Sequence, residues 1–354
     1  MTFIPHSKPW LTEADIEAVN KVIRSGMIGQ GEKTSAFERA LSQWFGIDDG
    51  GVAVGSGAAA LVMALSALGV KSGDEVILPT YVCSSVLEAV FTIEAIPVLC
   101  DVSDEWVVKS ENMSDYINKR TKAIIVPHMY GIFADVSSFR EFGVPIIEDC
   151  AQALDYRKRR KISGDIAMFS FHPTKCLTTG EGGMAVSENS DLLTAMRSFR
   201  DGNVLANRAR LFSPMSDISA VLGLYQLSRY HETLDRRQYI AHQYIDRLTE
   251  VVPNSLMLSA YENSMFFRFP ITIKGGLDKF KDMFAKKGIC VRRGVDKLLH
   301  HQMQMPDDKY KTSLNLFNET VSFPIYAAMT DNQITRCAEA ADEIFSAVSS
   351  DMNN

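Results

Sequence analysis

The sequence predicts an α/β fold: a mainly parallel seven-stranded sheet with helices on both faces, followed by a smaller α+β domain. From residue 51 onward, short apolar runs alternate with helical stretches, which is the pattern of repeated βα units. The runs are apolar, as expected of strands covered on both faces. The length of 354 residues also favours two domains. We predict a large domain over residues 1–235, including an N-terminal segment 1–30, and a small domain over 236–354.

The individual elements follow from local patterns. Each predicted strand is a short apolar run between turn-forming residues, and each predicted helix is a longer stretch of helical character. Strands are predicted at 51–55, 75–79, 97–102, 123–127, 145–148, 165–171, 183–186, 266–273, 290–292 and 320–324. Helices are predicted at 12–25, from 34 onward, and at 58–68, 84–93, 217–250, 277–287 and 330–349.

Composition argues against several classes of function. The chain is 46% hydrophobic and 23% charged, as globular proteins are, and its net charge of −6 without a basic stripe argues against a nucleic-acid partner. No apolar run approaches the ~18 residues that span a bilayer, and the N-terminus does not resemble a signal peptide. The six cysteines are scattered, without metal-binding spacing. We therefore expect a cytoplasmic protein with no membrane segment, no disulfide and no metal site.

A lysine and an aspartate stand at the carboxyl ends of two predicted strands, where ligands bind in α/β sheets. Asp149 ends the run Ile-Glu-Asp, and Lys175 follows the next strand in the run Ser-Phe-His-Pro-Thr-Lys. A Schiff-base lysine and a carboxylate that pairs with a pyridinium nitrogen are the groups that pyridoxal-phosphate (PLP) chemistry needs. A single lysine is normally a surface group and a single aspartate a cap. Their joint placement indicates an enzyme.

Two further strand ends carry candidate ligand-binding groups. The run Gly55-Ser-Gly-Ala58 follows the first strand and opens a helix, so its N–H groups and the helix dipole could hold a phosphate. The alternative is a plain tight turn. Tyr81 closes the second strand and could offer an aromatic face to a ligand.

Motifs in a fixed order along the chain carry a family resemblance. They include Ser25–Gly31, Gly57–Leu61, Gly73–Pro79, His128–Gly131, Glu148–Gln152, Ser170–Lys175, Thr179–Gly183, Met215–Ile218 and Phe323–Tyr326. With these motifs the chain resembles, from Ile4 nearly to its end, the DegT/DnrJ/EryC1/StrS family of fold-type-I PLP enzymes, mostly sugar aminotransferases. The resemblance implies PLP as the cofactor and a homodimer with its active site at the subunit interface.

The resemblance also implies a role for each matching residue. Lys175 would form the Schiff base with the cofactor and move protons as the general acid and base. Asp149 would keep the pyridine nitrogen protonated through the opposite-charge effect on its pKa. Gln152 would hydrogen-bond the 3-hydroxyl of the cofactor.

The cofactor phosphate would be held by Ser170 and by the backbone amides of Gly57 and Ala58. The family usually has threonine where Ala58 stands, so one hydroxyl contact is missing here. The aromatic residue that stacks on the cofactor ring most often aligns with Cys83, which leaves Tyr81 as the substitute.

Substrate contacts are predicted from the small domain and from the lysine run. Arg292 and Arg293 lie in the segment that approaches the active site in this family, and guanidinium groups suit a carboxylate or an anionic sugar substituent. The alternative for both is surface salt-bridging. His172 is predicted to be a scaffold or substrate contact. The asparagine that reaches the partner subunit's phosphate in the family aligns near Phe212, where this chain departs from the pattern.

The implied reaction moves an amino group from L-glutamate to a keto sugar, expected to be linked to a nucleotide, in two half-reactions on one cofactor. A free keto sugar acid stays open as the acceptor because of the two arginines. One alternative is a sugar dehydratase of the same fold, but those members typically carry histidine in place of the lysine. The other alternative is a non-catalytic binding or regulatory member of the family. The presence of Lys175, Asp149 and Gln152 argues against it.

Overall fold

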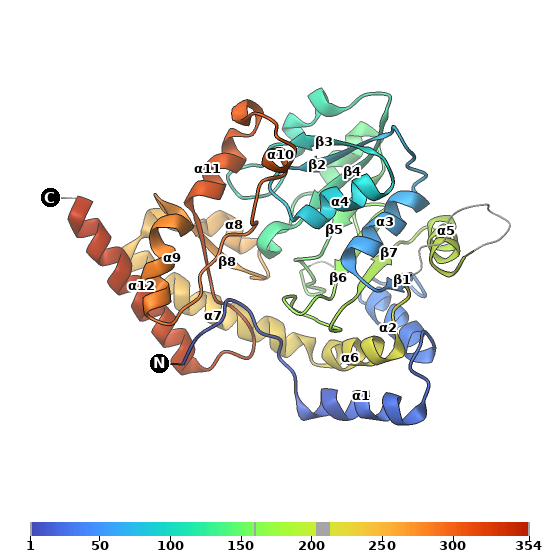
Figure 1. The fold of residues 1–354 in the computed structure, drawn as a ribbon, viewed down its shortest axis with the longest axis horizontal. Helices are drawn as coiled ribbons and strands as arrows, with labels where there is room; N and C mark the ends of the chain where they lie inside the picture. The colour runs from blue at the N-terminus through green and yellow to red at the C-terminus, as the bar shows by residue number, and fades with distance from the viewer. Residues whose placement is uncertain (1, 159–160, 203–212, 353–354) are drawn as a thin grey trace.

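The computed structural model describes residues 2–158, 161–202 and 213–352, and its α/β architecture is shown in Figure 1. The strands are β1 Gly51–Val54, β2 Glu75–Pro79, β3 Ile96–Cys100, β4 Thr121–Pro127, β5 Ile146–Asp149, β6 Ile166–Ser170, β7 Gly183–Val186, β8 Phe269–Thr272 and β9 Thr320–Phe323. The α-helices are α1 Glu13–Ser25, α2 Glu32–Gln43, α3 Gly57–Ala67, α4 Ser84–Thr92, α5 Ser190–Asp201, α6 Asp217–Ser228, α7 Tyr230–Val251, α8 Leu258–Glu262, α9 Gly276–Lys286, α10 Leu299–Gln302, α11 Lys311–Glu319 and α12 Asp331–Met352. No helix within these described stretches is long and apolar enough to cross a membrane.

Seven strands form the main sheet, in the order β1-β7-β6-β5-β4-β2-β3. Neighbouring strands pair in parallel except for β7, which runs antiparallel to both β1 and β6. Side chains alternate between two covered faces, as β6 illustrates. Ile166 and Met168 belong to the core that includes α3 and α4, whereas Ala167 and Phe169 pack with α2 and α6. The predicted fold class is confirmed.

The predicted elements differ from the observed ones at several places. Residues 290–292 were expected to form a strand but contribute only a single bridge, between Arg292 and Ser322. Helices α5, α8, α10 and α11 were not predicted, and the helix predicted over 217–250 is two helices, α6 and α7. Helices α5 and α11 bury apolar side chains, among them Met196 and Leu316, and this packing stabilises them.

A second core surrounds the small antiparallel sheet of β8 and β9. It is built from apolar side chains within 240–345 and from Ile4 of the N-terminal segment, and it lies beside α7, α9 and α12 in Figure 1. The predicted domain boundary falls inside α7, and apolar side chains within 295–316 return to the core of the main sheet. The division into 1–235 and 236–354 stays a prediction.

The start of α2 is capped from a distant helix. Gly31 precedes α2 without a capping side chain, and Asp217, in the first turn of α6, supplies the acceptor. Its carboxylate accepts hydrogen bonds from the N–H groups of Gly31 (2.9 Å), Lys33 (3.1 Å) and Thr34 (2.9 Å) and from the Thr34 hydroxyl (2.8 Å). A Cβ at Gly31 would lie 2.8 Å from this carboxylate, so a larger residue there would have to displace the capping side chain. The two helices are thus fixed to each other by one buried side chain.

Replacing Asp217 with alanine is expected to destabilise the protein. The substitution leaves the first N–H groups of α2 without their acceptor, and we expect the free energy of unfolding to fall by about 2–4 kcal/mol. Chemical denaturation of the wild type and the variant measures this difference. Asp217→Asn keeps one acceptor oxygen and should lose less. An unchanged unfolding free energy in Asp217→Ala would contradict the capping role.

Candidate active site

Asp149 and Lys175 are placed at the same edge of the main sheet. Asp149 is the last residue of β5, and Lys175 lies in the turn that follows β6. The Lys175 N–H donates to the His172 C=O (2.8 Å) and closes this turn. Because β5 and β6 are adjacent and parallel, their carboxyl ends meet at one edge, where ligands bind in such sheets.

The two groups act on each other's ionisation. Burial raises the pKa of the Asp149 carboxyl, while a hydrogen bond from the Ala151 N–H (2.9 Å) and the charge of Lys175 lower it. Burial lowers the pKa of the Lys175 amine below its usual 10.5, the charge of Asp149 raises it, and Arg268 lowers it further. A lysine with a lowered pKa is more often neutral, and a neutral amine is the form that acts as nucleophile and base.

The N-terminus of α3 forms a cradle opposite Ser170. Ser56 caps the helix by accepting from the Ala59 N–H (3.1 Å), whereas the N–H groups of Gly57 and Ala58 have no hydrogen-bond partner among the described residues. A Cβ at Gly57 would lie 2.8 Å from the Ser170 Cβ, so the helix start and this serine are in close contact. Unpaired N–H groups at a helix N-terminus attract a phosphate.

Gln152 is oriented by the backbone beside it. Its Oε1 accepts a hydrogen bond from the Tyr130 N–H (2.9 Å), which leaves the Nε2 group, in contact with the Met129 sulfur (3.4 Å), as a donor. Gln152 lines one small cavity together with Ser170, Lys175 and Phe267. An amide donor at this place suits a hydroxyl or phenolate oxygen.

The structure separates the two candidates for stacking on the cofactor. Cys83 is exposed at the N-terminus of α4, and its sulfur is close enough to Lys175 to affect the pKa of that amine. Tyr81 is fully buried in the core of the main sheet, and its hydroxyl contacts the Tyr130 hydroxyl (3.0 Å). A fully buried ring has no free face, so its position does not suit the stacking role predicted for it. Phe212 lies outside the described residues.

The two predicted arginines point in different directions, because neighbours in an extended segment alternate. Arg293 is held by the carboxylate of Asp278, and its guanidinium lies 4.4 Å from the ring centre of Phe317. Arg292 pairs through its backbone with Ser322 and is exposed. Of these two arginines, Arg292 is the one without an ion pair in the described part of the chain, which makes it the better candidate for an anionic substrate.

His172 lies at the surface beside the lysine turn. Its Nδ1 contacts the Thr174 hydroxyl (2.9 Å), and its Nε2 lies 4.0 Å from the Glu181 carboxylate. These contacts order the turn that carries Lys175, so a scaffold role is supported more directly than a substrate contact.

Sequence reasoning missed Arg268, which lies next to the site. The run Met-Phe-Phe-Arg-Phe-Pro at 265–270 was predicted as part of a strand, in which an arginine is expected to face solvent. In the structure its guanidinium instead packs 4.4 Å from the ring centre of Phe267, which lines the cavity of Lys175. A single arginine inside an otherwise apolar run was the available signal.

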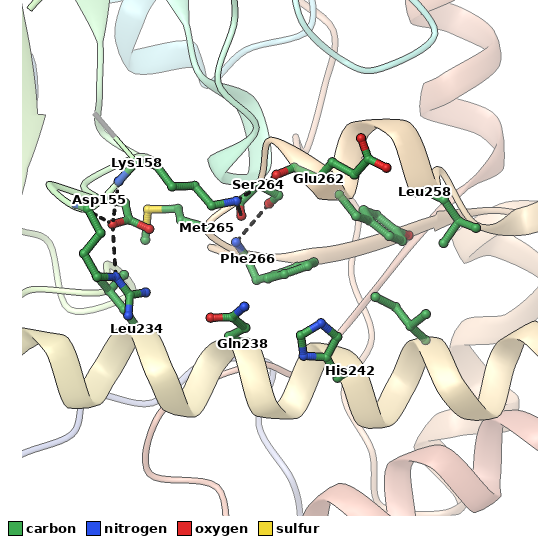
Figure 2. Close-up of a pocket in the computed structure, with 13 residues that line it drawn as sticks. Asp155, Lys158, Leu234, Gln238, His242, Leu258, Glu262, Ser264, Met265 and Phe266 are labelled. Carbon is green, nitrogen blue, oxygen red and sulfur yellow. Dashed lines mark hydrogen bonds and ion pairs between the residues drawn. The ribbon is translucent and has the colours of Figure 1, made fainter. Parts of the chain in front are cut away.

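A larger cavity, of about 420 Å³, lies away from these residues (Figure 2). Gln238 and His242 project from α7 into it, opposite Lys158 and Ser264. The Lys158 Nζ donates to the carbonyl oxygens of Glu262 (2.9 Å) and Ser264 (2.7 Å). Its cation is therefore already satisfied, and the cavity contains none of the predicted site residues.

The residues at the sheet edge fit PLP: a lysine beside a buried carboxylate, an amide donor, and free N–H groups opposite a serine. A sequence model of the DegT/DnrJ/EryC1/StrS aminotransferase family matches residues 9–342. The chain belongs to this family.

Solved structures of other proteins agree with membership of the DegT/DnrJ/EryC1/StrS family. The aminotransferase TlmJ from Streptoalloteichus hindustanus is 26% identical, with a TM-score of 0.90 over 98% of this chain and 100% of that chain. PseC from Helicobacter pylori, an aminotransferase involved in the biosynthesis of pseudoaminic acid, is 21% identical, with a TM-score of 0.86 over 98% and 100%. Spr1654 from Streptococcus pneumoniae in its PLP-form is 23% identical, with a TM-score of 0.87 over 98% and 99%.

The DegT/DnrJ/EryC1/StrS aminotransferases depend on PLP, and Spr1654 has been solved in a PLP-form and a PMP-form, with the pyridoxamine phosphate. The chain is therefore a PLP-dependent aminotransferase. The predictions of the family, the fold class and the cofactor are confirmed.

Proposed function

We propose that this enzyme transfers an amino group from L-glutamate to a keto sugar that is linked to a nucleotide. The observation that carries the proposal is the pairing of Lys175 with the buried Asp149 at the carboxyl edge of the sheet, beside the N-terminus of α3. A sugar acceptor is supported by the similarity to PseC, which is involved in the biosynthesis of pseudoaminic acid.

Each side chain has a definable task in this reaction. When bound, PLP supplies an electron sink that makes a proton on the substrate carbon acidic. The Lys175 Nζ takes up and returns that proton, for which its lowered pKa suits it. Asp149 holds the pyridine nitrogen in its protonated form by its opposite charge. The free N–H groups at the start of α3 and the hydroxyl of Ser170 bind the phosphate, and the Nε2 of Gln152 donates to the 3-hydroxyl.

We further propose that the enzyme works as a homodimer in the cytoplasm. Exposed apolar side chains gather on α1, on the loop after it and on α6, around a hollow of about 750 Å³. They are Ile23, Met27, Ile28 and Tyr225. An apolar patch of this kind is typical of a surface that another chain covers. The six cysteines all lie in the described residues and form no disulfide, which supports a reducing compartment.

The test is the absorbance of the purified, PLP-loaded protein before and after L-glutamate is added. We expect the long-wavelength band of the lysine-linked cofactor to shift, with one equivalent of 2-oxoglutarate released. A nucleotide-linked keto sugar should then restore the band and yield an amino sugar. No shift with any amino acid would overturn the proposed reaction. A shift that no sugar reverses would overturn the acceptor alone.

A further inference from the structure

Arg268 lies where the two cores meet, immediately before β8. Its backbone N–H donates to the C=O of Tyr130 (3.2 Å), in the short 3₁₀ turn Met129–Gly131 whose N–H orients Gln152. Burial lowers the pKa of its guanidinium to about 10, and the neighbouring charges of Arg237 and Arg292 act in the same direction. The side chain therefore carries a charge in an environment that opposes it.

The guanidinium of Arg268 has no anionic partner in the described part of the chain. No ion pair there includes Arg268, Arg237 or Arg292, and the Nη1 of Arg268 is buried without a hydrogen-bond partner. Arg237 is different, because its Nη1 donates to the carbonyl oxygens of Phe266 (3.0 Å) and Ile325 (3.1 Å). Arg268 as a residue is partly buried, and a charge largely shielded from water without a partner is costly, so one that persists points to a ligand that completes it.

A neighbouring histidine does not compensate the charge. His6 is buried and contacts the Ser322 hydroxyl (3.1 Å). Burial holds its pKa well below 6.5, and the charges of Arg268 and Arg292 lower it further. A neutral His6 leaves the partly buried Arg268 and the exposed Arg292 as a cluster of two positive charges.

The cluster lies within reach of the reacting centre. The guanidinium carbon of Arg268 is 4.4 Å from the ring centre of Phe267, and the Lys175 Nζ is 5.3 Å from the same ring centre. The charge of Arg268 also acts on the pKa of Lys175. Both cations therefore lie against the ring of Phe267.

We propose that Arg268, with Arg292 beside it, binds a carboxylate of the substrate whose reacting carbon lies at Lys175. A planar guanidinium donates two parallel N–H bonds to a carboxylate, a geometry that the ammonium of a lysine lacks. In an amino acid the α-carboxylate is bonded to the carbon that carries the amino group, so an amino donor presents a carboxylate this close to the lysine. The inference rests on the proposed function and specifies its substrate class.

Two sources share this chemistry, the amino donor and a keto sugar acid as acceptor. The diphosphate of a nucleotide-linked sugar is the other anion that the enzyme would meet. It is attached to the anomeric carbon, so the sugar ring lies between it and a carbonyl elsewhere on the ring. Because Arg268 lies close to Lys175, it suits a carboxylate next to the reacting carbon better than a diphosphate on the far side of the sugar ring.

The test measures binding of maleate, a dicarboxylate that cannot react, to the PLP-loaded protein by calorimetry. We expect Arg268→Leu to weaken maleate binding by about 10- to 100-fold, the effect of losing hydrogen bonds between charged groups. Arg268→Lys should lie between the wild type and Arg268→Leu. The matched control is Arg39→Leu, at an exposed position on α2, which should bind maleate like the wild type. Circular dichroism and the cofactor band check that each variant is folded and loaded.

Further measurements separate the outcomes. Maleate binding that is unchanged in Arg268→Leu would overturn the inference, as would a loss of pyrophosphate binding with maleate binding intact. If Arg268→Leu also raises the L-glutamate concentration needed to shift the cofactor band, the carboxylate belongs to the donor. If that concentration is unchanged while maleate binding falls, the carboxylate belongs to the acceptor. A wild type that binds maleate through Arg268 but reacts with no amino acid would overturn the proposed function and leave this inference standing.

Discussion

Replacing Lys175 with alanine is expected to lower turnover by about 10⁴-fold and to remove the covalent attachment of the cofactor. The lysine amine is the group placed to link PLP and to move the proton of the substrate, and its lowered pKa favours the neutral form that both tasks need. The variant should lose its long-wavelength absorbance on dialysis. Steady-state rates with L-glutamate and a nucleotide-linked keto sugar measure the loss of turnover.

A matched lysine and a chemical rescue separate this role from general damage. Lys281→Ala removes an exposed lysine from α9 and should leave both the absorbance and the rate unchanged. A small primary amine such as ethylamine, added to Lys175→Ala, should restore part of the rate because it supplies the missing base. Turnover near the wild-type rate in Lys175→Ala without added amine would refute the assignment.

Asparagine at position 149 should lower the turnover number by roughly 10²- to 10³-fold, the effect of breaking a buried charge pair. The substitution keeps an oxygen that accepts from the Ala151 N–H, so the local fold should survive while the negative charge is lost. Without that charge the pyridine nitrogen is protonated less readily. Stopped-flow measurement of the half-reaction with L-glutamate reports the change directly.

The same substitution should also move the titration of Lys175. The charge of Asp149 raises the pKa of the lysine amine, so removing it should lower that pKa further. In the cofactor-free protein, the rate of reaction with added PLP should reach half its maximum at a lower pH in Asp149→Asn than in the wild type. A PLP analogue with a permanent N-methyl cation should recover activity in the variant. No recovery, together with an unmoved pH profile, would show that the carboxylate acts only in folding.

The parts of the site that lie at strand ends were predictable from the sequence. The end of each apolar run of strand length predicts where that strand ends. A polar residue just after that end lies at the edge of the sheet where ligands bind. Asp149 and Lys175 were identified in this way, and the start of α3 was found because glycine and serine precede a helical stretch. These inferences depend on residues close in sequence and on one general rule of sheet topology.

The remaining features depend on contacts that no local pattern contains. Tyr81 is adjacent to a strand end, but its ring is buried against Tyr130 from a different crossover. The pair Arg292 and Arg293 looks uniform in sequence, yet the two side chains diverge because one meets Asp278. The burial of Arg268 results from the packing of α7 and of the 129–131 turn against the segment before β8. Each of these outcomes requires the tertiary structure.

The N-terminal segment has a consequence for how the enzyme is made. Ile4 pairs with Ile289, its N–H donates to the Gly288 C=O (2.8 Å), and His6 contacts Ser322. Ile4 and His6 therefore find their partners only after the chain has been synthesised to Gly288 and to Ser322, respectively. Until then His6 is not packed beside Arg268 and Arg292, so a chain that ends before Ser322 cannot complete this part of the proposed substrate site.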